Sequence, residues 1–87
     1  MPLYMDIHES VPEGTTALDV AGAHAADVSV QDKYGVDYRS YWVDEADGQV
    51  EKVFCLIDAP NQEAAVAVHK EAHGLLADRI HEVVAGA

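Results

Sequence analysis

Basic residues are scarce in this sequence, and their scarcity excludes several classes of partner. Five Lys and Arg stand against 16 Asp and Glu, so the formal net charge is −11. A surface that binds nucleic acid needs basic side chains to neutralise phosphates, and an anionic membrane attracts the same kind of surface. We therefore expect neither nucleic acid nor membrane as a partner. The acidity attracts cations weakly, and its simplest role is solubility.

Cysteine and long apolar runs are scarce as well. Cys55 is the only cysteine, so no disulfide forms within the chain, which is typical of proteins in a reducing compartment. No stretch approaches the roughly 20 apolar residues of a membrane-spanning helix, and residues 1–10 lack the basic start and apolar run of a signal peptide. We therefore expect a cytoplasmic protein. Glycine-rich phosphate loops, G-x-S-x-G elbows and Cys-x-x-Cys pairs, which would indicate common enzyme classes, are also missing.

The order of strand and helix patterns predicts a single ferredoxin-like α+β domain over residues 1–87. Strands are indicated by alternating or β-branched residues, and helices by apolar residues at helical spacing after an N-cap residue. The expected strands cover residues 3–8, 36–43, 50–57 and 79–84, and the expected helices cover residues 17–31 and 62–73. This βαββαβ order predicts an antiparallel sheet with both helices on one face.

The first helix has a start signal and an apolar stripe. Thr16 is suited to cap it, and Asp19, three residues further on, completes a capping box. At 100° per residue, small and branched apolar residues fall on one stripe, which we expect to face the sheet. This stripe consists of Ala17, Leu18, Ala21, Ala25 and Val28. His24 lies beside the stripe, three residues before Asp27, and we interpret the two as a local His–Asp pair.

The first strand alternates, so its two faces differ in character. Tyr4, Asp6 and His8 point the same way, and we expect them on the sheet face that carries no helix. A second subunit could cover this face together with the aromatic residues of the second strand, so we expect a homodimer. These aromatic residues are Tyr38, Tyr41 and Trp42.

Two histidines on the second helix are candidate metal ligands. His69 and His73 are four residues apart, which places their Cβ atoms about 5–6 Å apart on one helix face. Two imidazoles at this spacing can bind one divalent ion, and imidazole suits nickel, copper and zinc. The simpler alternative is two unconnected histidines, one packed and one solvated, which the spacing alone favours. Glu71 lies on another side of the helix, so the His-Glu-x-x-His protease pattern does not apply.

Further donor atoms come from other elements. Asp6 and His8 share a strand face about 7 Å apart, and divalent ions accept mixed carboxylate and imidazole ligands. Their alternative role is that of an ordinary polar sheet face. Cys55 lies in an apolar strand, where a cysteine usually acts as a small hydrophobic residue and becomes a ligand only if its sulfur faces a histidine. His81 on the last strand could lie next to the first strand and add another nitrogen.

Three stretches of the sequence are distinctive. They are residues 23–36, with Ala-His-Ala-Ala-Asp and Gln-Asp-Lys-Tyr-Gly-Val; residues 41–45, Tyr-Trp-Val-Asp-Glu; and residues 53–74, from Val-Phe-Cys-Leu to Val-His-Lys-Glu-Ala-His-Gly. Together they resemble a bacterial family of small ferredoxin-like proteins, long catalogued as a domain of unknown function, of which at least one member is a dimeric nickel-binding protein. The resemblance implies a homodimer that binds nickel at its surface for sequestration or response. The matching candidate ligands are His8, Cys55, His69 and His73.

Two other functions remain open at the level of sequence. Two ferredoxin-like subunits that face their sheets can enclose a pocket, as in small dimeric α+β-barrel monooxygenases and isomerases. Tyr4, Asp6, His8 and Trp42 would then surround a ligand, with His8 as the acid or base, tuned by Asp6. The other possibility is a protein-interaction module in which the histidines are incidental. We favour a protein that binds and sequesters nickel or another divalent transition metal, without enzymatic turnover.

Overall fold

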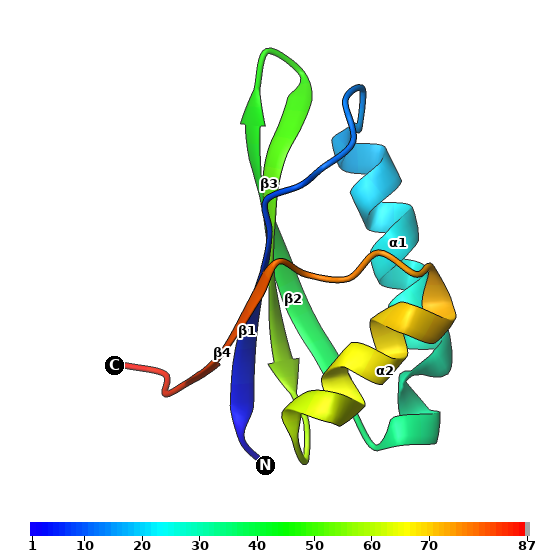
Figure 1. Ribbon diagram of the computed structural model, residues 1–87, viewed down its shortest axis with the longest axis vertical. Coiled ribbons are helices and arrows are strands. Elements are labelled where there is room, and N and C mark those ends of the chain that lie inside the picture. The colour runs from blue at the N-terminus through cyan, green and yellow to red at the C-terminus, as the bar shows by residue number, and fades with distance from the viewer. Residues whose placement is uncertain (87) are drawn as a thin grey trace.

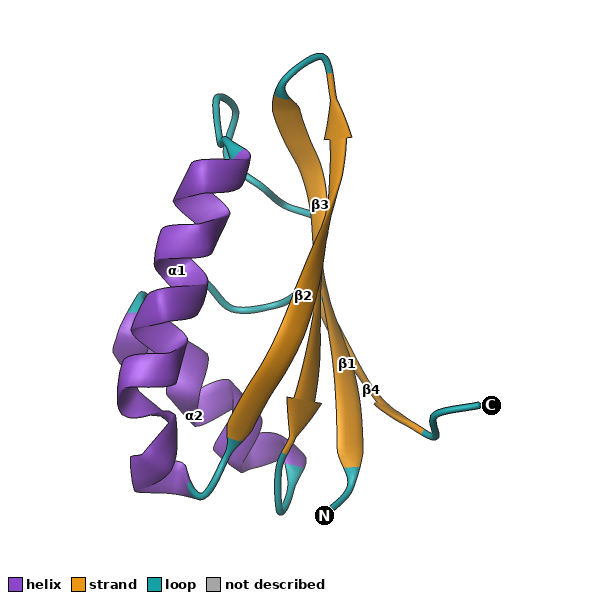
Figure 2. Cartoon of the chain, turned by 180° about the vertical axis from the view of Figure 1, so that it is seen from behind, coloured by secondary structure: helices purple, strands orange, loops and turns teal. Residues whose placement is uncertain are grey.

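One antiparallel sheet of four strands is covered on one face by two helices (Figure 1). The computed structural model describes residues 1–86. Its elements in chain order are β1 (Leu3–His8), α1 (Ala17–Val30), the 3-10 helix η1 (Gln31–Tyr34), β2 (Asp37–Ala46), β3 (Gln49–Asp58), α2 (Gln62–Ala72) and β4 (Arg79–Val83). The strand order across the sheet is β2-β3-β1-β4, and Figure 2 shows both helices on the same side of it. The predicted ferredoxin-like α+β fold is therefore confirmed.

Local sequence signals set the starts of both helices. The Thr16 hydroxyl accepts a hydrogen bond from the Asp19 N–H, and the Asp19 carboxylate accepts one from the Thr16 N–H, which is the predicted capping box of α1. Asn61 caps α2 by accepting a hydrogen bond from the Ala64 N–H at 2.8 Å. These bonds satisfy N–H groups that have no partner inside the helix, so each helix begins where such a side chain stands.

The hairpin between β2 and β3 is tighter than the sequence suggested. The expected strands end at residue 43 and resume at residue 50, but the chain turns on Asp47 and Gly48 alone. Both residues have positive φ angles, 53° and 78°. This backbone suits a two-residue hairpin loop, because its twist matches that of the flanking strands. The strands therefore continue to Ala46 and from Gln49.

The expected apolar stripe of α1 is wrong at four of its five positions. Ala17 and Ala25 are exposed, and only Ala21 is partly buried. Leu18 is 80% exposed and Val28 is 44% exposed, whereas Val20 and Asp27 are buried. Val20 and Asp27 are seven residues apart and lie on one side of the helix, because 3.6 residues make one turn. Helix α1 turns this side inward because Asp27 has a partner on α2, His69, at 2.9 Å. The contact between Asp27 and His69, rather than the number of apolar residues on each side, thus decides which side of the helix faces inward.

The expected placement of the first-strand residues is also wrong. Tyr4 and Asp6 are 7% and 1% exposed and lie beneath the helices, not on the bare face. Strand β1 is central, and the register places Tyr4 opposite Ile57 and Asp6 opposite Cys55, so these side chains share one face of the sheet. Ile57 and Cys55 belong to the buried core. The alternation of a strand separates two faces, but it does not say which face a helix covers.

The second strand is divided in the same way. Tyr38 is 2% exposed, and its hydroxyl donates a hydrogen bond to the Ala65 carbonyl of α2 at 2.7 Å. It therefore belongs to the core and not to a subunit interface. Trp42 is paired with Phe54, which is also opposite Ile7, so it lies on the open face, where it is 51% exposed. The predicted pocket surrounded by Tyr4, Asp6, His8 and Trp42 is not formed, because Trp42 lies on the opposite side of the sheet.

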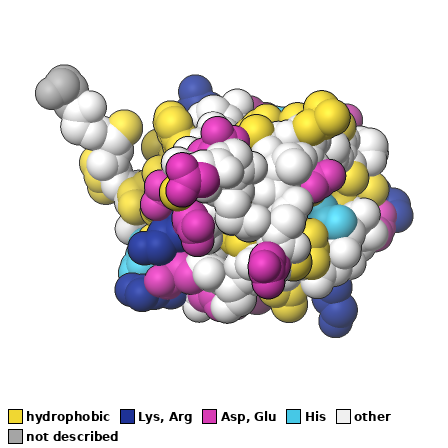
Figure 3. Space-filling view, turned by 90° about the horizontal axis from the view of Figure 1, so that it is seen from above, with side chains coloured by type: hydrophobic (Ala, Val, Ile, Leu, Met, Phe, Trp, Pro, Cys, Tyr) yellow, Lys and Arg dark blue, Asp and Glu magenta, His cyan; other side chains and the backbone are white. Residues whose placement is uncertain are grey.

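Two further surface properties bear on function. No helix within residues 1–86 is long and apolar enough to cross a membrane. The end of the molecule seen in Figure 3 carries many acidic side chains, with histidine and apolar side chains between them. The surface therefore favours cationic ligands over anionic ones.

Candidate metal centre

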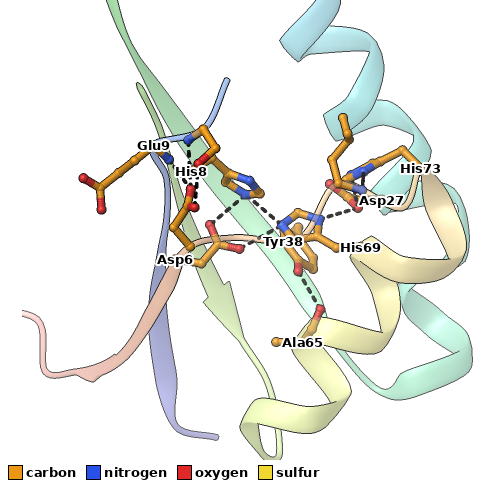
Figure 4. Close-up of polar contacts among 11 residues, drawn as sticks. Asp6, His8, Glu9, Asp27, Tyr38, Ala65, His69 and His73 are labelled. Atoms are coloured by element: carbon orange, nitrogen blue, oxygen red, sulfur yellow. Dashed lines mark hydrogen bonds and ion pairs between the residues drawn. The ribbon is translucent and has the colours of Figure 1, made fainter. Parts of the chain in front are cut away.

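A histidine from α2 lies between two buried carboxylates, one from the sheet and one from α1 (Figure 4). His69 Nε2 is 2.8 Å from Asp6 Oδ2, and His69 Nδ1 is 2.9 Å from Asp27 Oδ1. The three residues are 3%, 1% and 2% exposed, respectively for His69, Asp6 and Asp27. The ring of Tyr38 packs against the imidazole at a centroid distance of 4.7 Å. Both ring nitrogens of His69 are thus engaged by carboxylates inside the protein.

This arrangement holds a proton on His69 in the metal-free protein. Burial opposes a charge on the imidazole, but the hydrogen bonds and the attraction of Asp27 and Asp6 outweigh it and raise the pKa of His69 to about 9. Burial likewise opposes the charge of Asp6, but its hydrogen bonds with His69 and His8 outweigh it and lower the pKa of Asp6 to about 2. The two carboxylates thus offset the cost of burying the positive charge of the imidazolium.

Two more donor atoms face the same point. His8 Nε2 lies 3.3 Å from His69 Nε2 and 3.4 Å from Asp6 Oδ1. Apart from this long contact with His8, the buried Asp6 Oδ1 has no hydrogen-bond partner within residues 1–86. The sulfur of Cys55 completes a group in which all four donor atoms lie within 4.8 Å of one another. Burial and the neighbouring Asp6 raise the pKa of the Cys55 thiol, so the sulfur carries its proton while no metal is bound.

The spacing of these atoms fits a divalent ion. An ion with metal–nitrogen bonds of about 2.1 Å holds neighbouring donors about 3.0–3.4 Å apart, at right angles or tetrahedral angles. The distances from His8 Nε2 to His69 Nε2 and to Asp6 Oδ1, 3.3 and 3.4 Å, fall in this range. The distance from His69 Nε2 to the other carboxylate oxygen, Asp6 Oδ2, is slightly shorter at 2.8 Å. Burial of Asp6 Oδ1 is costly, because its long contact with His8 is not a full hydrogen bond. Donor chemistry, spacing and this unsatisfied oxygen all suit a metal ion.

A second group is formed by Asp27, His69 and His73. His73 Nε2 is 3.0 Å from Asp27 Oδ1, and its ring lies 4.9 Å from that of His69, centroid to centroid. His69 and His73, the predicted neighbours at i and i+4, therefore lie in contact, and both rings lie against the Asp27 carboxylate. His73 Nδ1 accepts a hydrogen bond from the Leu75 N–H at 3.0 Å, which leaves the ring proton on Nε2, facing Asp27. Asp27 thus hydrogen-bonds the His69 ring and contacts the His73 ring, whose buried Nε2 has no hydrogen-bond partner within residues 1–86. A metal role for His73 stays a prediction.

Comparison with known proteins shows the family to which this chain belongs. The sequence profile of the family described as nickel responsive protein SCO4226-like matches residues 4–83. The chain belongs to this family. Among solved structures, the crystal structure of SCO4226 from Streptomyces coelicolor A3(2) is similar, with a TM-score of 0.83 and 36% identity over 98% of this chain and 99% of that one. The comparison with curated proteins gave no match. The predicted resemblance to a small, nickel-related bacterial family is confirmed.

Other histidines of this SCO4226-like protein lie outside both groups. His81 is opposite Met5, as a neighbour of the first strand, but this pair faces away from Asp6 and the helices. His24 does not pair with Asp27, as the sequence suggested, because Asp27 is engaged by α2. The His24 ring instead contacts the ring of Tyr41 at a centroid distance of 4.8 Å.

Asp27 is the residue that sequence analysis missed. It was treated only as a partner of His24, yet it joins both histidines of α2 to α1. One signal was available: Asp27 lies seven residues after Val20, so a charged residue shares the helix side of a branched apolar one. A charge at such a position is buried only if it is paired, and it therefore points to a partner on another element.

A cleft of about 400 Å³ opens beside the cluster of the SCO4226-like protein. It lies between α1 and the two segments that follow β1 and α2. Its lining includes His8, Cys55 and His69, so three of the four donor residues border open space. The donor atoms are therefore reachable from this cleft although His69 itself is almost wholly buried.

Proposed function

We propose that this SCO4226-like protein binds and sequesters a divalent transition-metal ion, nickel foremost, without enzymatic turnover. Asp6, His8 and His69 are the proposed nitrogen and oxygen donors, and the thiolate of Cys55 is the fourth donor. The observation that carries the proposal is the convergence of two imidazole nitrogens, 3.3 Å apart, on the two oxygens of one buried carboxylate, that of Asp6. The family description as nickel responsive supports nickel as the first ion to test.

The charge balance of the buried cluster supports this assignment. In the metal-free protein two carboxylates, Asp6 and Asp27, share one imidazolium. A divalent ion that displaces the protons of His69 Nε2 and of the Cys55 thiol leaves the total charge of the cluster unchanged, so binding creates no new unpaired buried charge. Coordination to a metal deprotonates a thiol even where its pKa is otherwise high.

Asp27 has a separate role in this proposal. It accepts the hydrogen bond from His69 Nδ1, which leaves Nε2 directed toward Asp6 and His8. A carboxylate behind a ligating histidine fixes its tautomer and ring orientation, and removal of such a partner typically costs about 10–100-fold in metal affinity. Asp27 is thus a positioning residue rather than a ligand.

Calorimetry on tag-free, metal-free protein tests the proposal directly. Nickel should bind with a defined stoichiometry, and cobalt, zinc and copper serve as comparisons because copper exceeds nickel at most nitrogen and oxygen sites. His8→Ala should abolish or strongly weaken binding. His69→Ala should do the same, but it also strands two buried carboxylates at a cost of about 3–5 kcal/mol, so its folding must be checked.

His81→Ala is the matched control, because it removes an exposed imidazole from the opposite sheet face. It should bind nickel as the wild type does. Undiminished binding in His8→Ala, or equal losses in His8→Ala and His81→Ala, would reject the proposed donor set.

We further propose that a second copy of the chain covers the open sheet face. This face combines Trp42 and Phe54 of the hairpin with Met5 and Ile7 of β1, none of which a helix covers. An apolar patch of this kind complements itself under twofold symmetry, and a domain of this size gains much stability by burying it. Lys52 and Asp44, opposite each other beside the patch, give it charges of both signs.

Sedimentation velocity tests the dimer with two substitutions of the same chemistry. Trp42→Arg should convert the dimer to a monomer, because it buries a charge in the proposed interface. Leu18→Arg, on the exposed side of α1, should leave the dimer intact, since Leu18 is already 80% exposed. A monomeric wild type, or dissociation by Leu18→Arg alone, would count against this interface.

A further inference from the structure

The cleft beside the metal centre is larger than a single ion requires. Its volume of about 400 Å³ falls within the range of about 300–1,000 Å³ that is typical of small-molecule sites. Resting on the metal-binding proposal above, we propose that the cleft holds a small organic chelator with nitrogen and oxygen donors. The chelator and the protein would bind the same ion, so the metal is held as a ternary complex.

The lining of the cleft favours an organic ligand over water molecules. Val11, Ala23, Leu75 and Leu76 supply an apolar wall beside the donor residues. Water against such a wall is unfavourable, so a ligand with some apolar surface gains free energy by displacing it. Nickel also accepts tetragonal coordination with more than four donors, so an ion held by the four proposed residues could take further donors from a ligand in the cleft.

Two rings provide polar and aromatic contacts on the same wall. His24 and Tyr41 lie together at 4.8 Å between centroids, and both line the cleft. No hydrogen bond engages either side chain within residues 1–86, so the ring nitrogens and the hydroxyl remain available to a ligand. Apolar walls with a few convergent polar groups are the usual composition of a small-molecule site. A ligand with a flat ring can also pack against these two rings.

The charge of the cleft narrows the ligand class. Its lining residues include Asp19, Asp27 and Asp78 but no Lys or Arg. All three carboxylates accept hydrogen bonds within the protein, which holds them in place. An anionic complex would be repelled, whereas a complex of net positive charge would be attracted. A divalent ion with one amino-acid chelator such as histidine is net positive, and the same ion with citrate is net negative.

Equilibrium dialysis with radiolabelled histidine tests the inference on the full chain. Nickel on the protein is counted separately by elemental analysis. The wild type should retain nickel alone, and with nickel present it should also retain about one histidine per bound ion. Histidine without nickel should not be retained. Labelled citrate with nickel should leave no label on the protein.

Two substitutions on α1 provide the structural control. Ala23→Phe places a ring in the cleft without touching the four donor residues, and it should lose the histidine label while nickel alone is still retained. Ala25→Phe puts the same ring on the exposed side of the helix and should retain both. The citrate comparison on the wild type needs no substitution, so the inference stays testable if Ala23→Phe fails to fold.

The outcomes separate this inference from the metal-binding proposal. If nickel alone is not retained, the proposed metal function fails, and the ternary complex fails with it. If nickel is retained but histidine strips it from the protein, or leaves it without a label, only the ternary complex is overturned. Retention of histidine without nickel, or equal retention by Ala23→Phe, would also overturn it.

Discussion

Nickel binding should strengthen steeply between pH 7.5 and pH 8.5, because the ion must displace protons from two buried donors. Burial opposes the charge of His69, but Asp27 and Asp6 outweigh it and raise its pKa to about 9. Burial and Asp6 raise the pKa of the Cys55 thiol as well. An ordinary imidazole, with a pKa of about 6.5, has already lost its proton in this interval. The change of nickel affinity with pH in this interval therefore measures the protons released from His69 and Cys55.

The magnitude follows from the number of protons released. Each proton displaced from a group that is still protonated multiplies the affinity by about ten per pH unit, or about 1.4 kcal/mol. With both His69 and Cys55 as donors, the association constant should rise about 100-fold over this unit of pH. Cys55→Ser should reduce the rise to about tenfold, since only His69 then releases a proton.

Isothermal titration calorimetry in pairs of buffers with different ionisation enthalpies counts these protons directly. The expected values at pH 8 are about two protons per ion for the wild type and about one for Cys55→Ser. Asp27→Asn removes one of the two carboxylates that raise the pKa of His69, so it should flatten the pH dependence further. Asp32→Asn, an exposed residue outside both groups, is the matched control and should behave as the wild type.

Two results would refute this reasoning. A slope of about one in both the wild type and Cys55→Ser removes Cys55 from the donor set and leaves His69. An association constant that does not change between pH 7.5 and pH 8.5 shows that no proton leaves a buried donor, and His69 is then not a ligand.

Three further predictions concern the same buried region. In metal-free protein the raised pKa of His69 stabilises the fold fully below pH 6.5, the ordinary pKa of histidine, and this stabilisation is lost as the pH rises through about 9. The lowered pKa of Asp6 stabilises the fold above pH 3.8, the ordinary pKa of aspartate, and this stabilisation is lost as the pH falls toward 2. Melting curves in chelator should therefore peak between about pH 4 and pH 6.5, and a constant melting temperature from pH 6.5 to pH 9 would contradict the pairing. Tyr38→Phe should lower stability by about 1 kcal/mol, or the melting temperature by about 4–8 °C. Tyr34→Phe, which removes only the exposed bond from the Tyr34 hydroxyl to Glu71, should change it little, and equal shifts would reject a buried bond to the Ala65 carbonyl. Cobalt bound to the wild type should give a sulfur-to-metal charge-transfer band that Cys55→Ser lacks, and a band of equal strength in the variant would exclude the sulfur.

The local chemistry of the sequence determined where the elements begin and end. Thr16 with Asp19 was predicted to cap α1 and does so, because a capping bond joins residues only three apart. Asn61 caps α2 for the same local reason. Asp47 and Gly48 turn the hairpin for a similarly local reason, since both adopt positive φ. The order of these elements was enough to predict the ferredoxin-like fold, because few topologies accommodate it.

The sequence predicted which residues could be metal donors, but not how they are placed relative to one another. Asp6, His8, Cys55 and His69 were proposed one element at a time, and the sequence does not state which faces of β1 and β3 meet α2. The register that puts Asp6 opposite Cys55 depends on residues about 50 positions apart in the chain, which only the folded sheet brings together.

Asp27 shows most clearly what the tertiary structure decided. From the sequence it was the neighbour of His24, three residues away, and Leu18 and Val28 were expected to face the sheet. The fold instead turns Val20 and Asp27 inward, because a carboxylate on α1 meets an imidazole on α2, 42 positions later in the chain. Spacing within one helix predicts which residues share a side, whereas a buried charge takes its partner from whichever element packs against it, and that partner is set only when the chain has folded.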